Sequence, residues 1–170
     1  MSVAIEQKNI KPASGRGGKY LTFVLGREEY ALEILKVREI IGYMDITPVP
    51  RTPPHIKGVI NLRGQVIAVV DLRARFAMEQ IARTEQTCIV VVEIQGADRK
   101  IITGIVVDRV SEVITINEKD TEDAPAMGAS VDTAFVLGMG KVGKSVMILL
   151  DIDKVLSQAD VAAVASEIQQ

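Results

Sequence analysis

Residues 138–145 read Gly-Met-Gly-Lys-Val-Gly-Lys-Ser, which is the spacing of a phosphate-binding loop. In a nucleotide hydrolase the backbone amides of such a loop cradle the phosphates, Lys144 meets their charge and Ser145 holds magnesium. That loop must open a helix, whereas residues 146–150, Val-Met-Ile-Leu-Leu, favour a strand. We therefore interpret 138–145 as a glycine-rich hairpin turn with surface lysines, and keep nucleotide binding only as an alternative.

The chain has one histidine and one cysteine, which restricts its chemistry. His55 follows two prolines in a loop, where it has no partner for a metal ion and no nucleophile to activate. Cys88 begins the apolar run 88–92 and is predicted to be a buried hydrophobic residue. Asp151 and Asp153 have the position of ordinary helix-start residues. The sequence thus predicts no catalytic residue, no metal site and no cofactor, and we expect that the protein is not an enzyme.

Composition and charge argue against further classes of protein. Of the 170 residues, 48% are hydrophobic, enough for one domain or for two small ones that share a core. The formal net charge of −2 argues against nucleic-acid binding through phosphate contacts. No stretch approaches the roughly 20 apolar residues of a membrane-spanning helix, and the first residues lack a signal-peptide apolar region. We therefore expect a cytoplasmic protein with no nucleic acid partner and no direct membrane insertion.

Residues 55–76 are predicted to form a hairpin followed by a helical turn. Residues 66–70 are an apolar, β-branched run typical of a strand buried on both faces, and Arg63-Gly64 is the predicted turn. Asp71 is placed to cap a short helical turn. Arg63 is expected to face solvent or a partner, because burying it alone would cost several kcal/mol.

The second half of the chain repeats the first. Residues 88–96 correspond to 20–26, 101–107 to 30–34, 110–113 to 37–40 and 146–156 to 66–76. Repeated strands with no long helix between them predict a mostly β protein, built as two small antiparallel barrels side by side. We place the first barrel at about residues 19–80 and the second at about 86–156, with a partner-binding groove between them.

Three segments lie outside the predicted strands. Residues 1–18 are polar and Gly-rich and are predicted to be a flexible tail. Residues 47–54 contain four prolines and are predicted to be a stiff connector, with a polyproline ligand as the alternative. Apolar residues share one face of a predicted C-terminal helix, of which 157–170 form the end: Ile152, Val155, Leu156, Ala159 and Ala163.

Five segments in order closely resemble the CheW family, the adaptor proteins of bacterial chemotaxis: Tyr30–Ile40, Ile56–Gly64, Val69–Arg73, Gly104–Val110 and Leu149–Leu156. The resemblance covers about residues 19–156. It implies two SH3-like five-stranded barrels around a shared hydrophobic interior. It also implies a non-enzymatic coupler that links the cytoplasmic hairpin tips of chemoreceptors to the CheA histidine kinase in membrane-bound receptor arrays.

The resemblance also implies sites of contact. Matching positions on the receptor side are Val37, Glu39, Arg63, Cys88, Gly104 and Val113, to which we add the neighbouring apolar Ile34. Matching positions on the kinase side are Gly58, with Ile56 beside it and Met127 in a later loop. Structural roles that involve no partner stay open as alternatives. Val37 can be plain core, Glu39 and Arg63 can solvate a face or pair with each other, and Gly104 can ease sheet curvature.

Two other functions fit the same sequence. One is a scaffold for a different histidine kinase pathway. The other is a regulatory domain of a larger kinase, although the tail before residue 19 and the helix ending at Gln170 favour a stand-alone chain.

Overall fold

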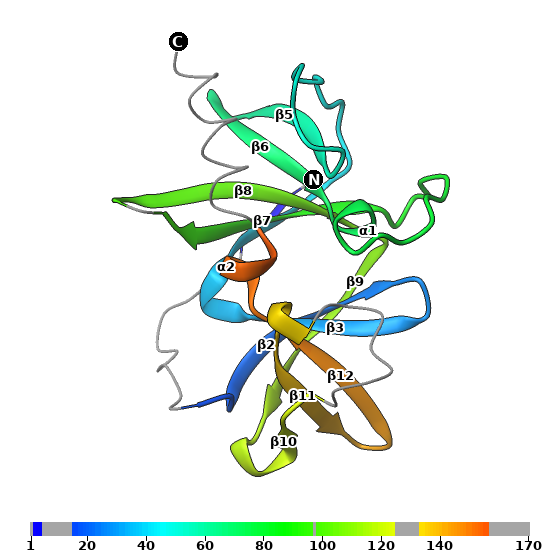
Figure 1. Cartoon of the computed structure of the whole chain (residues 1–170), viewed down its shortest axis with the longest axis vertical. Helices are drawn as coiled ribbons and strands as arrows, with labels where there is room; N and C mark the ends of the chain where they lie inside the picture. The colour runs from blue at the N-terminus through cyan, green and yellow to red at the C-terminus, as the bar shows by residue number, and fades with distance from the viewer. Residues whose placement is uncertain (1, 5–14, 97, 125–132, 157–170) are drawn as a thin grey trace.

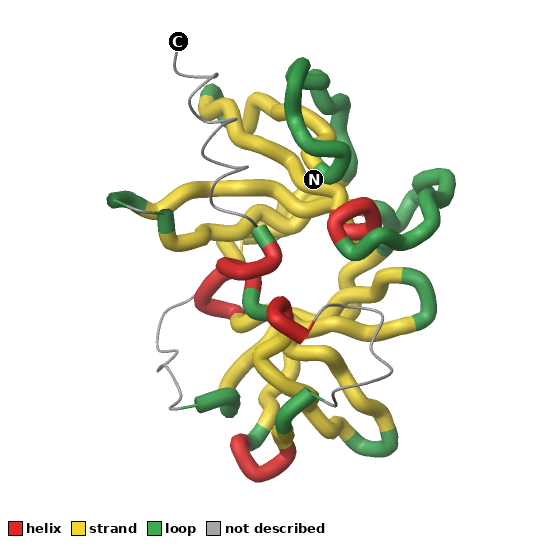
Figure 2. The backbone as a smooth tube through the Cα atoms, viewed as in Figure 1, coloured by secondary structure: helices red, strands yellow, loops and turns green. Residues whose placement is uncertain are grey.

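Two β-sheets form the body of the protein in the computed structural model, which describes residues 2–4, 15–96, 98–124 and 133–156. Figure 1 shows the sheets one above the other, and Figure 2 shows α1, α2, η1 and η3 as short turns between them. The short helical segments are η1 (Ile34–Lys36), α1 (Leu72–Arg75), η2 (Glu118–Asp120), η3 (Thr133–Phe135) and α2 (Ile152–Val155).

Each sheet contains five long strands and one short edge strand. Barrel A has the strand order β1 (Ser2–Ala4), β4 (Val37–Gly42), β7 (Cys88–Gln95), β8 (Lys100–Val107), β6 (Gln65–Asp71) and β5 (Ile56–Leu62). Barrel B has the order β10 (Thr121–Glu122), β11 (Val136–Val142), β12 (Ser145–Leu150), β3 (Glu28–Glu33), β2 (Gly18–Leu25) and β9 (Arg109–Ile116). The predicted mostly β fold of two five-stranded barrels is confirmed.

The two halves of the sequence exchange strands. Barrel A takes β4, β5 and β6 from the first half but β7 and β8 from the second, and barrel B takes β2 and β3 from the first half but β9, β11 and β12 from the second. The predicted boundaries at residues 80 and 86 therefore do not separate the barrels. The chain crosses between them at η1 and again directly from β8 to β9.

The exchange also changes the pairing that the repeat predicts. Most neighbouring strands are antiparallel, but β6 pairs with β8, and β12 with β3, in parallel. Strands of the two halves also meet at β4–β7 and β2–β9, where the pairing is antiparallel. Two further pairings involve the segments after β4 and β9. Thr47, which follows β4, pairs with Val59 of β5, and β10, which follows β9, pairs with β11.

The core has three parts. The largest lies between the barrels and draws on strands of both, and two smaller clusters come from barrel A alone and barrel B alone. A row of aromatic rings crosses the shared core, with centroid separations of 5.7, 5.8 and 6.2 Å between successive members Phe23, Tyr30, Phe76 and Phe135. The buried apolar surface of this shared core holds the barrels together.

The hairpin predicted at residues 55–76 is confirmed. Strands β5 and β6 join through Arg63 and Gly64, both with positive φ (51° and 88°), and the Gly64 amide donates to Asn61 Oδ1 at 2.8 Å. Asp71 accepts a hydrogen bond from the Arg73 amide at 3.0 Å and so caps α1, as predicted.

The phosphate-loop spacing at 138–145 lies in the equivalent hairpin of barrel B. Strands β11 and β12 pair from Val142–Ser145 back to Val136–Leu150 and turn at Gly143, whose φ is 60°. Gly138 and Gly140 are in the middle of a strand, paired to Leu149 and Met147. The interpretation as a hairpin is confirmed, because a phosphate loop must lead into a helix.

The structure corrects the prediction for the N-terminal end of the chain. Ser2–Ala4 forms a strand paired antiparallel with β4, where the sequence predicts a tail without structure of its own. Of the predicted C-terminal helix, the structure describes the turn α2, capped by Asp151, and residues 157–170 lie outside the described residues. Within the described part of the chain, no helix is long and apolar enough to cross a membrane.

Candidate partner-binding surface

Glu39 and Arg63 form an ion pair between β4 and the β5–β6 turn. The Glu39 side chain is 9% exposed, whereas that of Arg63 is 64% exposed. A buried carboxylate needs a partner, and Arg63 supplies it while its guanidinium stays at the surface. Of the alternatives that the sequence leaves open, the pairing of these two residues with each other is therefore the one found.

Glu39 lies at the end of a row of residues that crosses barrel A. Successive strands pair Glu39 with Val91, Val91 with Gly104, Gly104 with Val69, and Val69 with Gly58. Two proposed receptor positions and one proposed kinase position thus share one register line across five strands.

Gly104 is buried inside barrel A. A Cβ atom built on it would lie 2.8 Å from Ile89 Cγ2 and 3.5 Å from Val69 Cγ2. The absence of a side chain therefore makes room for Ile89, not for the backbone of a partner. An aspartate at this position would have to displace core residues, so such a variant tests barrel packing as much as partner binding.

Val37 and Ile34 do not offer the apolar surface that the sequence analysis assigns to them. Both are fully buried in the shared core, with 0% and 2% exposure. Ile34 begins η1, and Val37, three residues later, follows it as the first residue of β4. Val37 is therefore core, which is one of the alternatives that the sequence leaves open.

Val113 and Cys88 lie apart from the Glu39 row. Val113 is on β9 of barrel B, paired with Leu21, and is 46% exposed. Cys88 begins β7 and is half-buried, where burial raises the pKa of its thiol and a backbone hydrogen bond with Val110 partly offsets that rise. The raised pKa favours the neutral thiol, as expected for a packing residue.

The proposed kinase-side residues shape β5. Ile56 and Gly58 are buried and flank a β-bulge, at which two residues of β5 stand opposite the Val69–Val70 step of β6. Gly58 has a φ of 146°, and a Cβ atom on it would overlap the Thr47 carbonyl. Neither residue presents a side chain to solvent. Met127 lies outside the described residues.

An ion pair between Arg73 and Asp108, which the sequence patterns do not predict, ties α1 of barrel A to barrel B. The guanidinium and carboxylate meet in two hydrogen bonds of 2.8 and 2.6 Å, and the Gly26 amide of the β2–β3 turn donates to the same carboxylate at 2.8 Å. Burial of Asp108 raises the pKa of its carboxyl, but the hydrogen bonds from Arg73 and Gly26 and the charge of Arg73 together lower it below its ordinary value.

A second ion pair stands in the equivalent place with the charges reversed. Asp153 of α2 in barrel B pairs with Lys36 of η1 at 2.7 Å and accepts from the Gln95 amide of barrel A at 3.0 Å. We call the two pairs the inter-barrel clasps. Arg73 and Asp108 both fall in segments that carry the family resemblance, which was the available signal, but only the fold brings them together.

The described residues contain no group of three or more histidine, cysteine, aspartate or glutamate side chains placed to hold a metal ion. At the β5–β6 turn the exposed side chains include Arg63 and the apolar Val66, which is 41% exposed, and such a pair suits contact with a protein surface.

The family model of the CheW-like domain matches residues 19–160, which include the described strands of both barrels except β1 and the first residue of β2. The chain belongs to this family of chemotaxis scaffold proteins.

Individual relatives carry the same name. The chain is 39% identical to the chemotaxis protein CheW of Klebsiella aerogenes, over 87% of either chain. It is 38% identical to that of Bacillus subtilis, over 69% of this chain and 72% of the relative. A solved structure, the scaffolding protein TtCheW from Thermoanaerobacter tengcongensis, superposes with a TM-score of 0.75 at 35% identity, covering 85% of this chain and 97% of that one.

Proposed function

We propose that the protein is a non-enzymatic adaptor that couples the cytoplasmic tips of chemoreceptors to a CheA-type histidine kinase, and that it is thereby recruited to membrane-bound receptor arrays. Membership of a family of chemotaxis scaffolds supports this function. The observation that carries it is the Glu39–Arg63 pair, because a buried carboxylate holds an exposed cation at the tip of a hairpin. Such a preorganised charge is suited to fixing the register of a partner helix.

The receptor would contact barrel A around Arg63 and Glu39, and barrel B at the exposed Val113. Val113 supplies the apolar contact that the buried Val37 and Ile34 do not. Cys88 and Gly104 would act indirectly, by packing the strands that lie between these positions.

The kinase would contact barrel A on the side of β5. Gly58 and Ile56 would contribute by holding the bulge that shapes this strand, and not through exposed side chains. We propose Met127 as a further kinase contact. Kinase and receptor would then lie on one register line, which allows the occupancy of one partner to bias the other.

A bridging experiment tests the proposal. A receptor cytoplasmic fragment on beads should capture a CheA-type kinase only when this chain is present, and kinase autophosphorylation should rise in that complex. Val113→Glu should weaken receptor capture about tenfold by burying a charge in the contact. Val146→Glu is the matched control, because Val146 is equally an exposed valine, 55% exposed, on a hairpin with no proposed role.

Failure of the wild-type chain to bridge the two proteins would overturn the adaptor function with this kinase. Bridging of a different histidine kinase in the same assay would instead support the alternative scaffold role. Equal losses in Val113→Glu and Val146→Glu would show that the surface around Val113 is not a specific receptor contact.

A further inference from the structure

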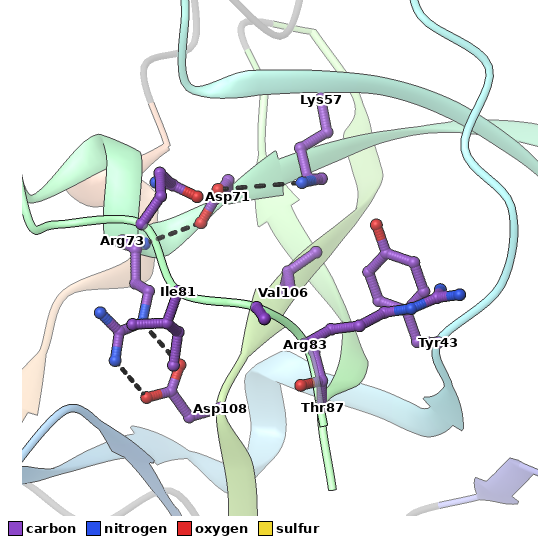
Figure 3. A pocket seen from close by; sticks show the side chains of 11 residues that line it. Tyr43, Lys57, Asp71, Arg73, Ile81, Arg83, Thr87, Val106 and Asp108 are labelled. Carbon is purple, nitrogen blue, oxygen red and sulfur yellow. Dashed lines mark hydrogen bonds and ion pairs between the residues drawn. The ribbon is translucent and has the colours of Figure 1, made fainter. Parts of the chain in front are cut away.

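A cavity of about 220 Å³ opens where the end of β6, helix α1 and the segment before β7 meet. Figure 3 shows its charged lining, with Lys57 pointing at Asp71 and Arg83 lying across the ring of Tyr43. The cavity is smaller than the roughly 300–1,000 Å³ that enclose a drug-sized ligand, so it fits one side chain and not a nucleotide. Its size alone therefore restricts the ligand to a small group.

The β-bulge in β5 directs Lys57 into this cavity. Lys57 is the extra residue between Ile56 and Gly58, and bulges re-aim the side chain that they carry. The equivalent hairpin has the same register shift, between Val136 and Gly138, and the residue within it is Leu137, which packs against the core of barrel B. The repeat thus supplies an internal comparison: one copy uses the bulge for packing, and the other directs a cation into a cavity.

The anionic groups of the cavity are committed to other contacts. Asp108 is held by Arg73 and the Gly26 amide, and Asp71 caps α1. Lys57 forms an ion pair with Asp71 at 4.0 Å, a distance too long for a hydrogen bond. Within the described part of the chain, the Arg83 guanidinium has only its contact with the Tyr43 ring, at 4.5 Å from the ring centroid. The Lys57 ammonium and the Arg83 guanidinium therefore keep hydrogen-bond donors for a further acceptor.

The lining carries one more positive charge than negative, with Lys57, Arg73 and Arg83 against Asp71 and Asp108. One carboxylate would balance this excess, whereas a phosphate group with a charge near −2 would exceed it. Ile81, which is 54% exposed, adds an apolar residue to the lining. An acidic side chain next to an apolar one, on a protein surface, matches both features.

We propose that this cavity binds an aspartate or glutamate side chain of a protein partner, through Lys57 and Arg83. The proposal rests on the adaptor function, and it assigns the partner as the kinase because Lys57 lies between the two kinase-side positions of β5. Arg83 belongs to a segment without regular secondary structure and is exposed, so it can close over the carboxylate. Lys57 fixes the position of the acid, and Ile81 contacts the neighbouring apolar residue.

Calorimetric titration of the full chain with the kinase tests the proposal. Lys57→Met and Arg83→Gln keep most of each side chain and remove its charge. Each should weaken kinase binding about tenfold, because a charge-assisted hydrogen bond is removed. The difference in affinity between wild type and variant should be smaller at high salt. Lys144→Met, at the exposed hairpin turn of barrel B, should change the affinity less than about twofold. Receptor binding should be unchanged in all three variants.

A charge-reversal screen locates the acid on the kinase. Each surface aspartate or glutamate of the kinase regulatory domain is changed to lysine, and Lys57→Glu should restore the binding of one such variant. Wild-type kinase affinity in both Lys57→Met and Arg83→Gln would overturn the cavity proposal and leave the adaptor function intact. A wild-type chain that does not bind the kinase would overturn the adaptor function first, so the two failures are distinguishable.

Discussion

Arg63 affects stability in two opposite ways: its ion pair with Glu39 stabilises the fold, whereas its left-handed backbone conformation destabilises it. Substitutions at this position can therefore separate stability from function. The residue has a φ of 51° at the β5–β6 turn, in the left-handed region where a non-glycine residue costs about 1–2 kcal/mol. Arg63→Ala removes the ion pair and keeps that backbone cost. Arg63→Gly removes the ion pair and relieves the backbone cost. Both variants lack the guanidinium that we propose to meet the receptor.

The magnitudes follow from the burial of the two partners. Because Glu39 is buried and Arg63 is mostly exposed, loss of the pair is expected to cost about 1–2 kcal/mol, less than for a pair buried on both sides. Arg63→Ala should therefore lower the free energy of unfolding by about 1–2 kcal/mol. Arg63→Gly should stay within about 1 kcal/mol of the wild type, because relief of the turn offsets the lost pair.

Urea unfolding and the bridging assay measure the two effects separately. The free energy of unfolding should be highest for the wild type, lower for Arg63→Gly and lowest for Arg63→Ala. Receptor-coupled kinase activation should be reduced equally in the two variants. If Arg63→Gly couples like the wild type, the guanidinium is not a receptor contact. If the two variants unfold alike, the left-handed conformation of the turn does not limit stability.

Two further predictions concern groups inside the fold. Thr103→Val should stabilise the protein by about 1 kcal/mol, because the fully buried Thr103 hydroxyl has no hydrogen-bond partner in the described structure. Thr22→Val is the matched control and should destabilise by about 1–2 kcal/mol, because its buried hydroxyl both donates to and accepts from the Glu112 backbone at 3.0 Å; equal urea midpoints for the two variants would contradict this. Asp108→Asn should destabilise by about 2 kcal/mol near pH 7, since it leaves Arg73 without its charge partner. The lowered pKa of Asp108 makes this stabilisation present above the unfolded-state pKa of about 3.9 and lost as the pH falls through the folded-state pKa. The difference in urea midpoint between wild type and variant should therefore shrink below about pH 4, and a difference independent of pH would refute the assignment.

Local features of the fold were predictable because they depend on neighbouring residues. Asp71 precedes an apolar turn and caps it, and Gly64 follows Arg63 in a two-residue hairpin turn. The context of Gly138–Ser145 was also sufficient, since a strand follows it where a phosphate loop needs a helix.

Long-range features were not predictable for a definite physical reason. The repeat gives each half the same strand pattern, so a barrel made from one half and a barrel with exchanged strands have the same local sequence signals. Val37 illustrates the limit at a candidate site, because an apolar residue next to charged ones fits a surface contact and a core position equally well. Arg73 shows it again, since its partner Asp108 is distant in sequence and joins it only through the fold.

The exchange of strands gives the protein a rigidity that suits a scaffold. The chain passes between the barrels at η1 and directly from β8 to β9, and both barrels contribute to the largest core cluster, so covalent connection and packing hold their relative position. Two of the crossings between barrels are short, and each of these is held by one clasp: Lys36 in η1 pairs with Asp153, and Asp108 between β8 and β9 pairs with Arg73. A partner bound to barrel A is thus held in a fixed position relative to barrel B. The proposed adaptor would influence a kinase through such fixed geometry, by favouring one arrangement of its partners over another.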